Sequence, residues 1–279
     1  MSNFRSQQSP MKNLTVILML FICSQTQSQP NFFERTYGLG RGMFIDKALN
    51  DNFIIGASTG TYPYFQGYYF LIDGNGDTIR TMNDPIPDVT CIRQTSDGGF
   101  IYTGDSCCDF TTVVNKTDSA GNILWHHFYP STSWATFAAS VIPNPENGYF
   151  VAFVDDGDGP ENSYIILKTD SSGNTLDSIV INTSVYSWIQ NYPELTTDSG
   201  LIVAHQRDQS FVLTKLDKND QLQWEKFFYD TNLVYGIMCS SAIQTNDGNY
   251  FIAGSENINM GDYPKYGYML KADANGDSL

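Results

Sequence analysis

Short apolar segments separated by polar turns make up nearly the whole chain after residue 30. In five of them a turn leads into an apolar strand, and the copies end at residues 56, 104, 153, 205 and 254. The spacings are therefore 48, 49, 52 and 49 residues, and such regularity indicates a repeat protein. The copies are LNDNFIIG (49–56), SDGGFIYTG (96–104), ENGYFVAF (146–153), DSGLIVAH (198–205) and NDGNYFIAG (246–254).

A second motif, of a strand, a turn and a strand, follows each of these segments. An Asp that opens such a turn is expected to accept backbone N–H bonds, and a Gly three positions later supplies a positive φ. In the fourth copy Asp220 takes the place of the Gly. Five copies of one turn indicate scaffold rather than five active sites. The shared residues are Asp73, Asp118, Asp170, Asp217 and Asp273.

Each unit holds four short strands, because a further alternating stretch such as VTCIRQT (89–95) or SSAIQT (240–245) precedes each pair of motifs. No segment after the first 28 residues has a sustained 3.6-residue period. Four antiparallel strands in about 50 residues match the size of a β-propeller blade. The sequence therefore predicts an all-β fold over 29–279, a β-propeller of five four-stranded blades.

The two ends of the repeat region complement each other. The fifth copy stops at Leu279, where a fourth strand should begin, and FFERTYG (32–38) resembles the fourth-strand text WEKFFYD (224–230). We expect the first strand to complete the last blade and so leave no lone sheet edge. The alternative is a fragment of a six- to eight-bladed ring.

The first 28 residues have the layout of a secretory signal peptide with an N-terminal extension. Lys12 precedes an apolar run at 14–23, and small polar residues follow. About ten apolar residues are too few to span a bilayer as a helix. We expect cleavage before Gln29, a secreted or cell-surface protein, and no stable membrane span.

Charge and composition narrow the class of protein further. The chain has 15 Lys and Arg against 30 Asp and Glu, a formal charge of −15, which excludes an electrostatic nucleic-acid site. A hydrophobic content of 41% excludes a disordered acidic tail. The 30 acids are 24 Asp and only 6 Glu, a balance typical of many turns and few helices.

Cysteine usage gives no disulfide framework. A bridge that involves Cys91 or Cys239 is left open by export, and free thiols are the alternative for these residues and for the adjacent Cys107 and Cys108. No CxxC motif or Cys/His cluster predicts zinc. Ile22 stands before Cys23 where a lipobox has a small residue, so a lipoprotein is not expected.

The repeat unit T-x-DGG-[FY] followed by K-x-D-x-x-GN-x-x-W resembles the tandem repeats of secreted bacterial β-propellers. These are quinoprotein-like or Delta-60-like proteins, and many carry a type IX secretion sorting domain. The resemblance covers about 32–279. It implies the fold and export, but no particular activity, because the motif consists mainly of turn chemistry.

The candidate catalytic strings lack the context that they need. GASTG (56–60) and GDSL (276–279) match nucleophile motifs, but no strand–turn–helix surrounds them, and the three histidines supply no triad partner. A channel enzyme would need converging polar side chains on the first strands, and three carboxylates within about 5–9 Å would favour it. The first strands carry mixed residues without a pattern: Cys91, Arg93, Ser140, Ile142, Glu194 and Ser240.

Aromatic residues outside the repeated positions are the best ligand signal. Trp125 and Trp224 recur at one repeat position and are expected to pack between blades. Other aromatic residues fall in loops and connections that a closed ring would bring to one face. Aromatic side chains beside carboxylates suit a carbohydrate or protein ligand. The predicted ligand-binding residues are Tyr62, Tyr64, Phe65, Trp134, Trp188, Tyr263 and Tyr266.

One acidic stretch, DDGDGPE (155–161), lies outside the repeated turns. Asp155, Asp156, Asp158 and Glu161 would suit a calcium ion, and a solvated loop is the alternative. No other cofactor is expected.

These patterns predict an exported, non-catalytic β-propeller that acts as a binding or cell-surface interaction module. Two alternatives stay open. One is a carbohydrate-active or quinoprotein-like enzyme with a site in the central channel. The other is a structural repeat segment of a longer surface adhesin.

Overall fold

The fold consists almost entirely of β-strands. The computed structural model describes residues 36–37, 41–61, 64–83, 88–105, 111–130, 136–155, 162–183, 192–207, 210–228, 237–256 and 266–279. Within these ranges the chain forms strands β1–β19 and one short 3-10 turn, η1 (Leu49–Asp51), without an α-helix.

The strands form five antiparallel sheets in chain order. The first contains β1 (Arg41–Lys47), β2 (Phe53–Thr61), β3 (Tyr64–Ile72) and β4 (Thr78–Asn83). The second contains β5 (Asp88–Gln94), β6 (Phe100–Asp105), β7 (Thr111–Thr117) and β8 (Ile123–Pro130). The third contains β9 (Thr136–Asn144), β10 (Gly148–Asp155), β11 (Asn162–Asp170) and β12 (Thr175–Thr183).

The fourth sheet contains β13 (Glu194–Leu195), β14 (Leu201–Arg207), β15 (Ser210–Leu216) and β16 (Leu222–Phe228). The fifth has three described strands, β17 (Ile237–Gln244), β18 (Tyr250–Glu256) and β19 (Tyr266–Ala272). Ser278 bridges to Ala272 at the position where a fourth strand would begin.

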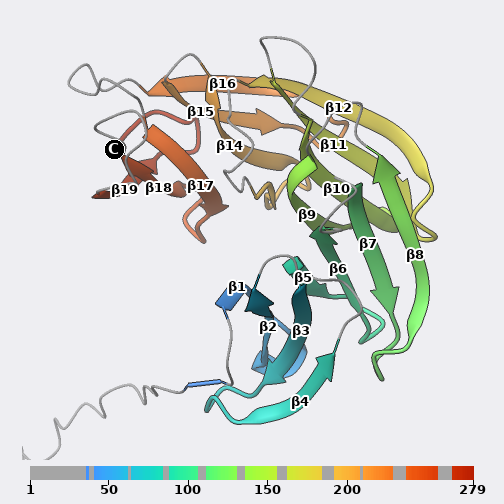
Figure 1. Cartoon of the computed structure of the whole chain (residues 1–279). Coiled ribbons are helices and arrows are strands. Elements are labelled where there is room, and N and C mark those ends of the chain that lie inside the picture. Colours follow the sequence, from blue (N-terminus) through green and yellow to red (C-terminus); the bar gives the residue numbers. More distant parts are fainter. Residues whose placement is uncertain are drawn as a thin grey trace, which may run out of the picture. The chain divides into compact units, whose positions relative to one another are not determined.

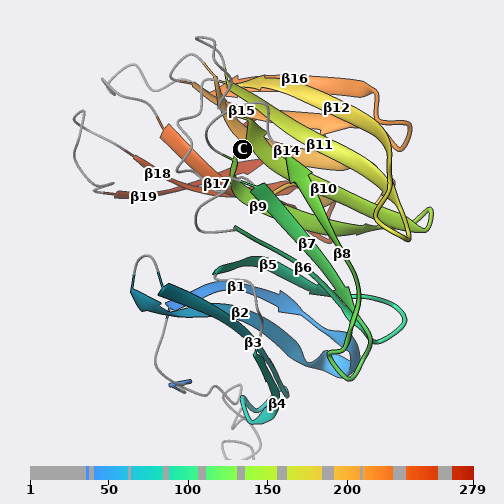
Figure 2. The same cartoon turned by 45° about the vertical axis from the view of Figure 1, so that its right-hand side comes forward.

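Residues 37–279 form one compact unit. In this unit β1, β5, β9 and β17 lie on the inside, and β4, β8, β12 and β16 lie on the outside (Figures 1 and 2). This arrangement confirms the predicted five-bladed β-propeller. No helix in the described ranges is long and apolar enough to cross a membrane.

Apolar layers between consecutive sheets form the core. One layer joins the third and fourth sheets, with Tyr164 and Ile166 packed near Val203, and another joins the fourth and fifth, with Phe211 near Ile252. Two middle strands of the third and fourth sheets, β10 and β15, are buried at every residue and therefore on both faces. At about 25 cal/mol per Å² of apolar area removed from water, these layers are the main stabilising contribution.

The repeated Asp turns have the predicted geometry. Asp73 Oδ1 accepts bonds from the backbone N–H groups of Asn75 and Asp77, both at 2.9 Å, and Gly76 has a φ of 82°. The same pair of bonds occurs in the other four copies. Asp220 adopts the positive φ at 64° without being a glycine.

Close packing gives a second reason for glycine in these turns. A Cβ atom on Gly173 would lie 2.6 Å from His127 and 3.0 Å from Trp125, which belong to the outermost strand of the preceding sheet. The Tyr129 hydroxyl donates to the carbonyl of the same glycine. Each turn is therefore a docking point for the preceding sheet as well as a reversal of the chain.

Tyr37 makes the equivalent contact with the first sheet. Its hydroxyl donates to the carbonyl of Gly76 at 2.6 Å, and its ring packs against Phe70 with centroids 5.0 Å apart. Most of the segment expected to complete the last blade, 32–38, lies outside the described residues. Its pairing with the fifth sheet stays a prediction.

A buried lysine links the two turns within a unit. Lys116 Nζ lies 2.8 Å from Asp97, and Lys215 Nζ lies 2.9 Å from Asp198, while both lysine side chains are less than 5% exposed. Burial works against the charged carboxylates of Asp97 and Asp198, but hydrogen bonds from the lysine, a threonine hydroxyl and a backbone N–H outweigh it and lower both pKa values to about 2. This lysine–acid pair is scaffold.

Ser199 offers a test of backbone strain. It holds a φ of 65° where the second and fifth units have Gly98 and Gly248. We expect Ser199→Gly to raise the free energy of unfolding by about 1 kcal/mol. The reverse change, Gly248→Ser, should lower it by a similar amount, since no atom lies within 4 Å of the added Cβ. Urea unfolding measures both changes. If the two variants changed the free energy of unfolding in the same direction, backbone strain would be refuted as the cause.

Candidate functional site

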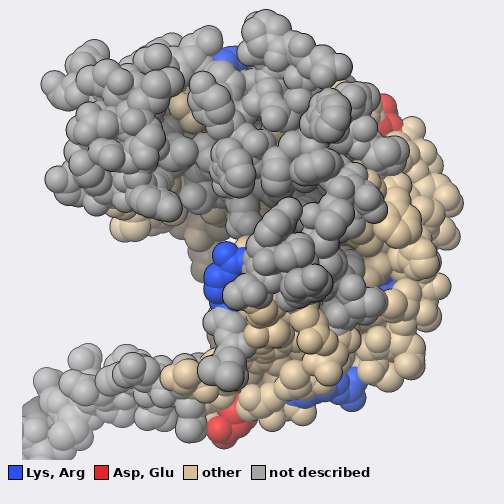
Figure 3. All heavy atoms as spheres, viewed as in Figure 1, with Lys and Arg blue, Asp and Glu red and all other residues tan. Residues whose placement is uncertain are grey.

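Among the described residues on the face seen in Figure 3, the acidic side chains lie apart from the basic ones. The sites that the structure offers are a central ion cluster and clefts between sheets.

The centre of the propeller holds a three-residue ion cluster. Arg93 on β5 donates to Asp46 on β1 at 2.8 Å and to Glu194 on β13. The Arg93 side chain is 11% exposed, and the Phe44 ring lies 5.3 Å from its guanidinium carbon. The inner strands of the first, second and fourth sheets thus meet at one cation. The sequence reading of the first strands as lacking a pattern was wrong for Arg93 and Glu194.

This cluster is built for cohesion rather than acid–base chemistry. Burial works against the charged guanidinium, but nearby acidic groups, among them Glu194 and Asp46, raise the pKa of Arg93 above its ordinary value. Burial raises the pKa of Glu194, with Arg93 opposing the shift. Only two carboxylates meet here among the described residues, and both accept bonds from the same arginine. A catalytic acid–base pair would need two carboxylates that are not both bonded to the same cation.

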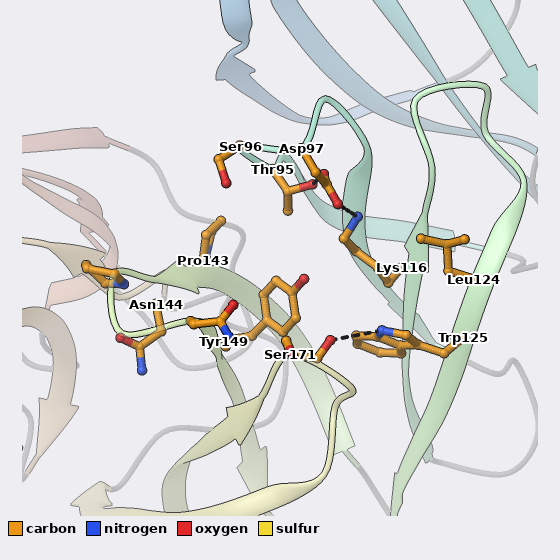
Figure 4. Close-up of a pocket in the computed structure, with 13 residues that line it drawn as sticks. Thr95, Ser96, Asp97, Lys116, Leu124, Trp125, Pro143, Asn144, Tyr149 and Ser171 are labelled. Atoms are coloured by element: carbon orange, nitrogen blue, oxygen red, sulfur yellow. Dashed lines mark hydrogen bonds and ion pairs between the residues drawn. The ribbon is translucent and has the colours of Figure 1, made fainter.

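A cleft of about 640 Å³ lies between the second and third sheets (Figure 4). We call it the 2/3 cleft. Its walls come from the β5–β6 turn, β7, β8, the β9–β10 turn and the β11–β12 turn. The lining side chains include Asp97, Lys116, Leu124, Trp125, Pro143, Asn144, Tyr149 and Ser171.

Tyr149 lies in the middle of the 2/3 cleft, between Asn144 and Trp125 (Figure 4). Its hydroxyl points toward the Asp97–Lys116 pair. Burial, reinforced by the negative charge of Asp97, raises the pKa of Tyr149 to about 12. The phenol therefore stays protonated at neutral pH and offers a donor as well as an acceptor.

Trp125 forms an aromatic wall of the same cleft. Its ring packs edge-on against Tyr149 with centroids 5.8 Å apart, and its Nε1 donates to the Ser171 carbonyl at 3.2 Å. Trp224 packs in the same way on Tyr250, at 5.6 Å. The predicted packing role of both tryptophans is confirmed. The repeat pattern gave no sign that Trp125 also lines a cleft.

One signal in the sequence would have pointed to this cleft. The first turn of the third unit reads NPEN (144–147), with Pro143 before it, where the second and fifth units have T-x-DG. Pro143, Asn144 and Pro145 all line the cleft. A departure from the repeat beside residues that do recur in the other units is the feature to look for.

Most of the aromatic residues predicted to bind a ligand lie outside the described residues. Tyr62, Trp134, Trp188 and Tyr263 are in this group. The backbone of three others is described: Tyr64 and Phe65 lie in β3 and Tyr266 begins β19, but their side chains are outside the description. Their role stays a prediction.

The predicted calcium loop is described at one residue only. Asp155 ends β10, is 7% exposed, and stands opposite Thr136 and Ser163. Asp156, Asp158 and Glu161 lie outside the described residues. In the part of the chain that is described, no group of three or more His, Cys, Asp or Glu side chains is placed to hold a metal ion.

Cys91 is a free, buried thiol whose Sγ lies 3.6 Å from the Val141 carbonyl. Burial raises its pKa to about 11, so it is unreactive at neutral pH. The bridge left open for Cys91 is therefore absent. The Cys239 side chain, Cys107 and Cys108 lie outside the described residues.

Comparison with known proteins gives a likeness at the level of structure. No protein-family model matches the chain, and no curated protein matches it. A protein of unknown function from Bacteroides caccae is similar over 88% of this chain and 82% of its own, with a TM-score of 0.55 and 13% identity. One from Dyadobacter fermentans has the same coverage and TM-score at 10% identity.

The Dos1 propeller is similar over 86% of this chain and 56% of its own, with a TM-score of 0.52 and 10% identity. Identities this low carry the fold and nothing further. These likenesses and the five sheets together show that the chain is a β-propeller.

Proposed function

We propose that this protein is an exported, non-catalytic β-propeller that works as a binding module, and that the 2/3 cleft takes a carbohydrate. The observation that carries the proposal is the cleft of about 640 Å³ with Trp125 and Tyr149 beside Asp97 and Asn144. This volume falls within the usual range for small-ligand sites, about 300–1,000 Å³. A sugar ring offers an apolar C–H face to aromatic side chains and hydroxyl groups to a carboxylate, an amide and a phenol.

A matched pair of variants tests this site. Tyr149→Phe removes the hydroxyl in the 2/3 cleft, while Tyr250→Phe removes the equivalent hydroxyl between the fourth and fifth sheets. We expect the full chain to bind specific sugars on a glycan array. Tyr149→Phe should weaken that binding by about threefold to tenfold, the value of one hydrogen bond, with Tyr250→Phe unchanged. The proposal would be refuted if the two variants weakened binding equally, or if the full chain bound no glycan on the array.

The loop aromatics predicted from the sequence are proposed as a further contact with a carbohydrate or protein at the cell surface. Changing Tyr62, Tyr64 and Tyr263 together should reduce capture of surface material by the full chain. An unchanged pull-down would argue against them.

Export is proposed from residues 12–28 alone. We expect protein collected from the medium or the cell surface to begin at Gln29, as read by N-terminal sequencing. Recovery of an uncleaved chain from the cytosol would contradict export.

A further inference from the structure

The fourth sheet carries a buried histidine at a position where no other repeat has a polar side chain. His205 ends its repeat copy, where the others end in Gly56, Gly104, Phe153 and Gly254. Thr214 precedes the repeated lysine, where the third and fifth units have leucine and the second has Asn115. Glu225 pairs with Thr214 across β15 and β16. A buried histidine in the scaffold of a single repeat calls for an explanation beyond the fold.

These side chains form a continuous hydrogen-bond chain. Thr214 Oγ1 donates to Glu225 Oε1 at 3.1 Å, so the His205 Nε2–H must donate to Thr214, at 2.9 Å. Arg207 donates to Glu225 Oε2 and stacks on Phe227, with its guanidinium carbon 4.7 Å from the ring centre. His205 and Thr214 are buried, whereas Arg207 and Glu225 are 26% and 22% exposed. The chain of bonds therefore runs from the interior to an accessible ion pair.

The ion pair opens into a cavity of about 330 Å³ between the third and fourth sheets. Thr214, Arg207 and Glu225 line it from the fourth sheet. The rest of the wall is largely aliphatic, with no aromatic side chain among the described lining residues. The aliphatic residues are Ile179, Val180, Ile181, Leu216 and Leu222.

Charge balance in this cavity favours a neutral ligand. Arg207 neutralises Glu225, and Lys168 lies 3.2 Å from Asp220, the other acid at the cavity. A charged ligand would have to leave water without a counter-charge to receive it.

Geometry selects the polar group of that ligand. A guanidinium has five N–H donors and the bond to Glu225 uses one, while each carboxylate oxygen has a second lone pair. A donor and an acceptor thus lie side by side at the aliphatic wall. A carboxamide presents the complementary pair, with its carbonyl toward Arg207 and its N–H toward Glu225.

We propose that the cavity between the third and fourth sheets is a second binding site, for a small neutral carboxamide with an aliphatic body. A free aliphatic amide and a short aliphatic peptide both carry this chemistry. The site is independent of the carbohydrate proposed for the 2/3 cleft.

Methyl NMR of the full chain tests the proposal with two probes, isovaleramide and N-acetyl-leucinamide. We expect saturable shifts of the Ile179 and Leu222 methyl groups at millimolar concentration, about the affinity that so few atoms allow. The methyl group of Ile101, buried in another layer, should not move. Binding of both probes indicates a peptide end, and binding of isovaleramide alone indicates a free amide. Isovalerate should bind about tenfold more weakly because it is charged.

Two variants keep the test decisive. Glu225→Gln preserves shape and should weaken binding by about threefold to tenfold. Ile179→Phe fills the cavity and should abolish the shift of Leu222 even if Glu225→Gln folds poorly. Lys226→Met is the control, since Lys226 is the next residue on β16 but binds Asp277, in the turn that follows β19. Unsaturable shifts, isovalerate binding as tight as isovaleramide binding, or unchanged affinity in Glu225→Gln and Ile179→Phe would overturn the proposal.

Discussion

Replacing Arg93 by methionine is expected to lower the free energy of unfolding by about 3–5 kcal/mol, the usual cost of breaking a buried ion pair from one side. The change leaves Asp46 and Glu194 facing a site without a cation, at the point where three sheets meet. Urea unfolding of the full chain measures the loss.

A surface pair provides the control for Arg93. Lys47 and Asp51 lie 2.9 Å apart, but their side chains are 69% and 88% exposed. Lys47→Met should therefore change stability by no more than about 0.5 kcal/mol. Glu194→Gln, added to Arg93→Met, should restore part of the loss because it removes one of the stranded charges. An Arg93→Met effect as small as that of Lys47→Met would show that the central cluster does not hold the sheets together.

Acidification from pH 7 to pH 4 is expected to remove about 3 kcal/mol of stability through His205. Burial lowers the pKa of His205 to about 4, with Glu225 opposing the shift and Arg207 adding to it. An unfolded histidine has a pKa of about 6.5, so between these values the unfolded chain binds a proton that the folded chain does not. Stability is therefore complete above pH 6.5 and falls as the pH drops toward 4.

Unfolding at a series of pH values separates this effect from that of the carboxylates. Asp97 and Asp198, with pKa values of about 2, contribute stability that is lost between about pH 4 and pH 2, below the histidine window. In His205→Gln, the free energy of unfolding should lose most of its dependence on pH between pH 6.5 and pH 4. In His126→Gln, at an exposed position on β8, this dependence should be kept. The same slope in both variants would assign the acid sensitivity to other groups.

The fold could be predicted because its information is local and repeated five times. The Asp turns follow from Asx chemistry within five residues, and even Asp220 was placed correctly in the role of a glycine. The spacing near 50 residues then fixed the number and size of the sheets. A fold can be predicted from its sequence where the local turn chemistry and the spacing of the repeat indicate the same structure.

The sites could not be predicted, because they depend on contacts between units. Arg93 and Glu194 are 101 residues apart and belong to short inner strands with no repeat signature. Trp125 and Tyr149 look like scaffold because Trp224 and Tyr250 repeat them. The third unit departs from the repeat at its first turn, beside the 2/3 cleft. This departure can be interpreted only when the position of the second sheet is known.

Hydrogen–deuterium exchange of the full chain, with and without the glycan that it retains best, tests the binding-module account most directly. Carbohydrate binding in the 2/3 cleft should slow exchange in two segments that face each other across it, 95–99 and 143–149, with little change in the equivalent turn at 245–250. Protection confined to other segments, or no protection at a saturating glycan concentration, would contradict the cleft as the binding site.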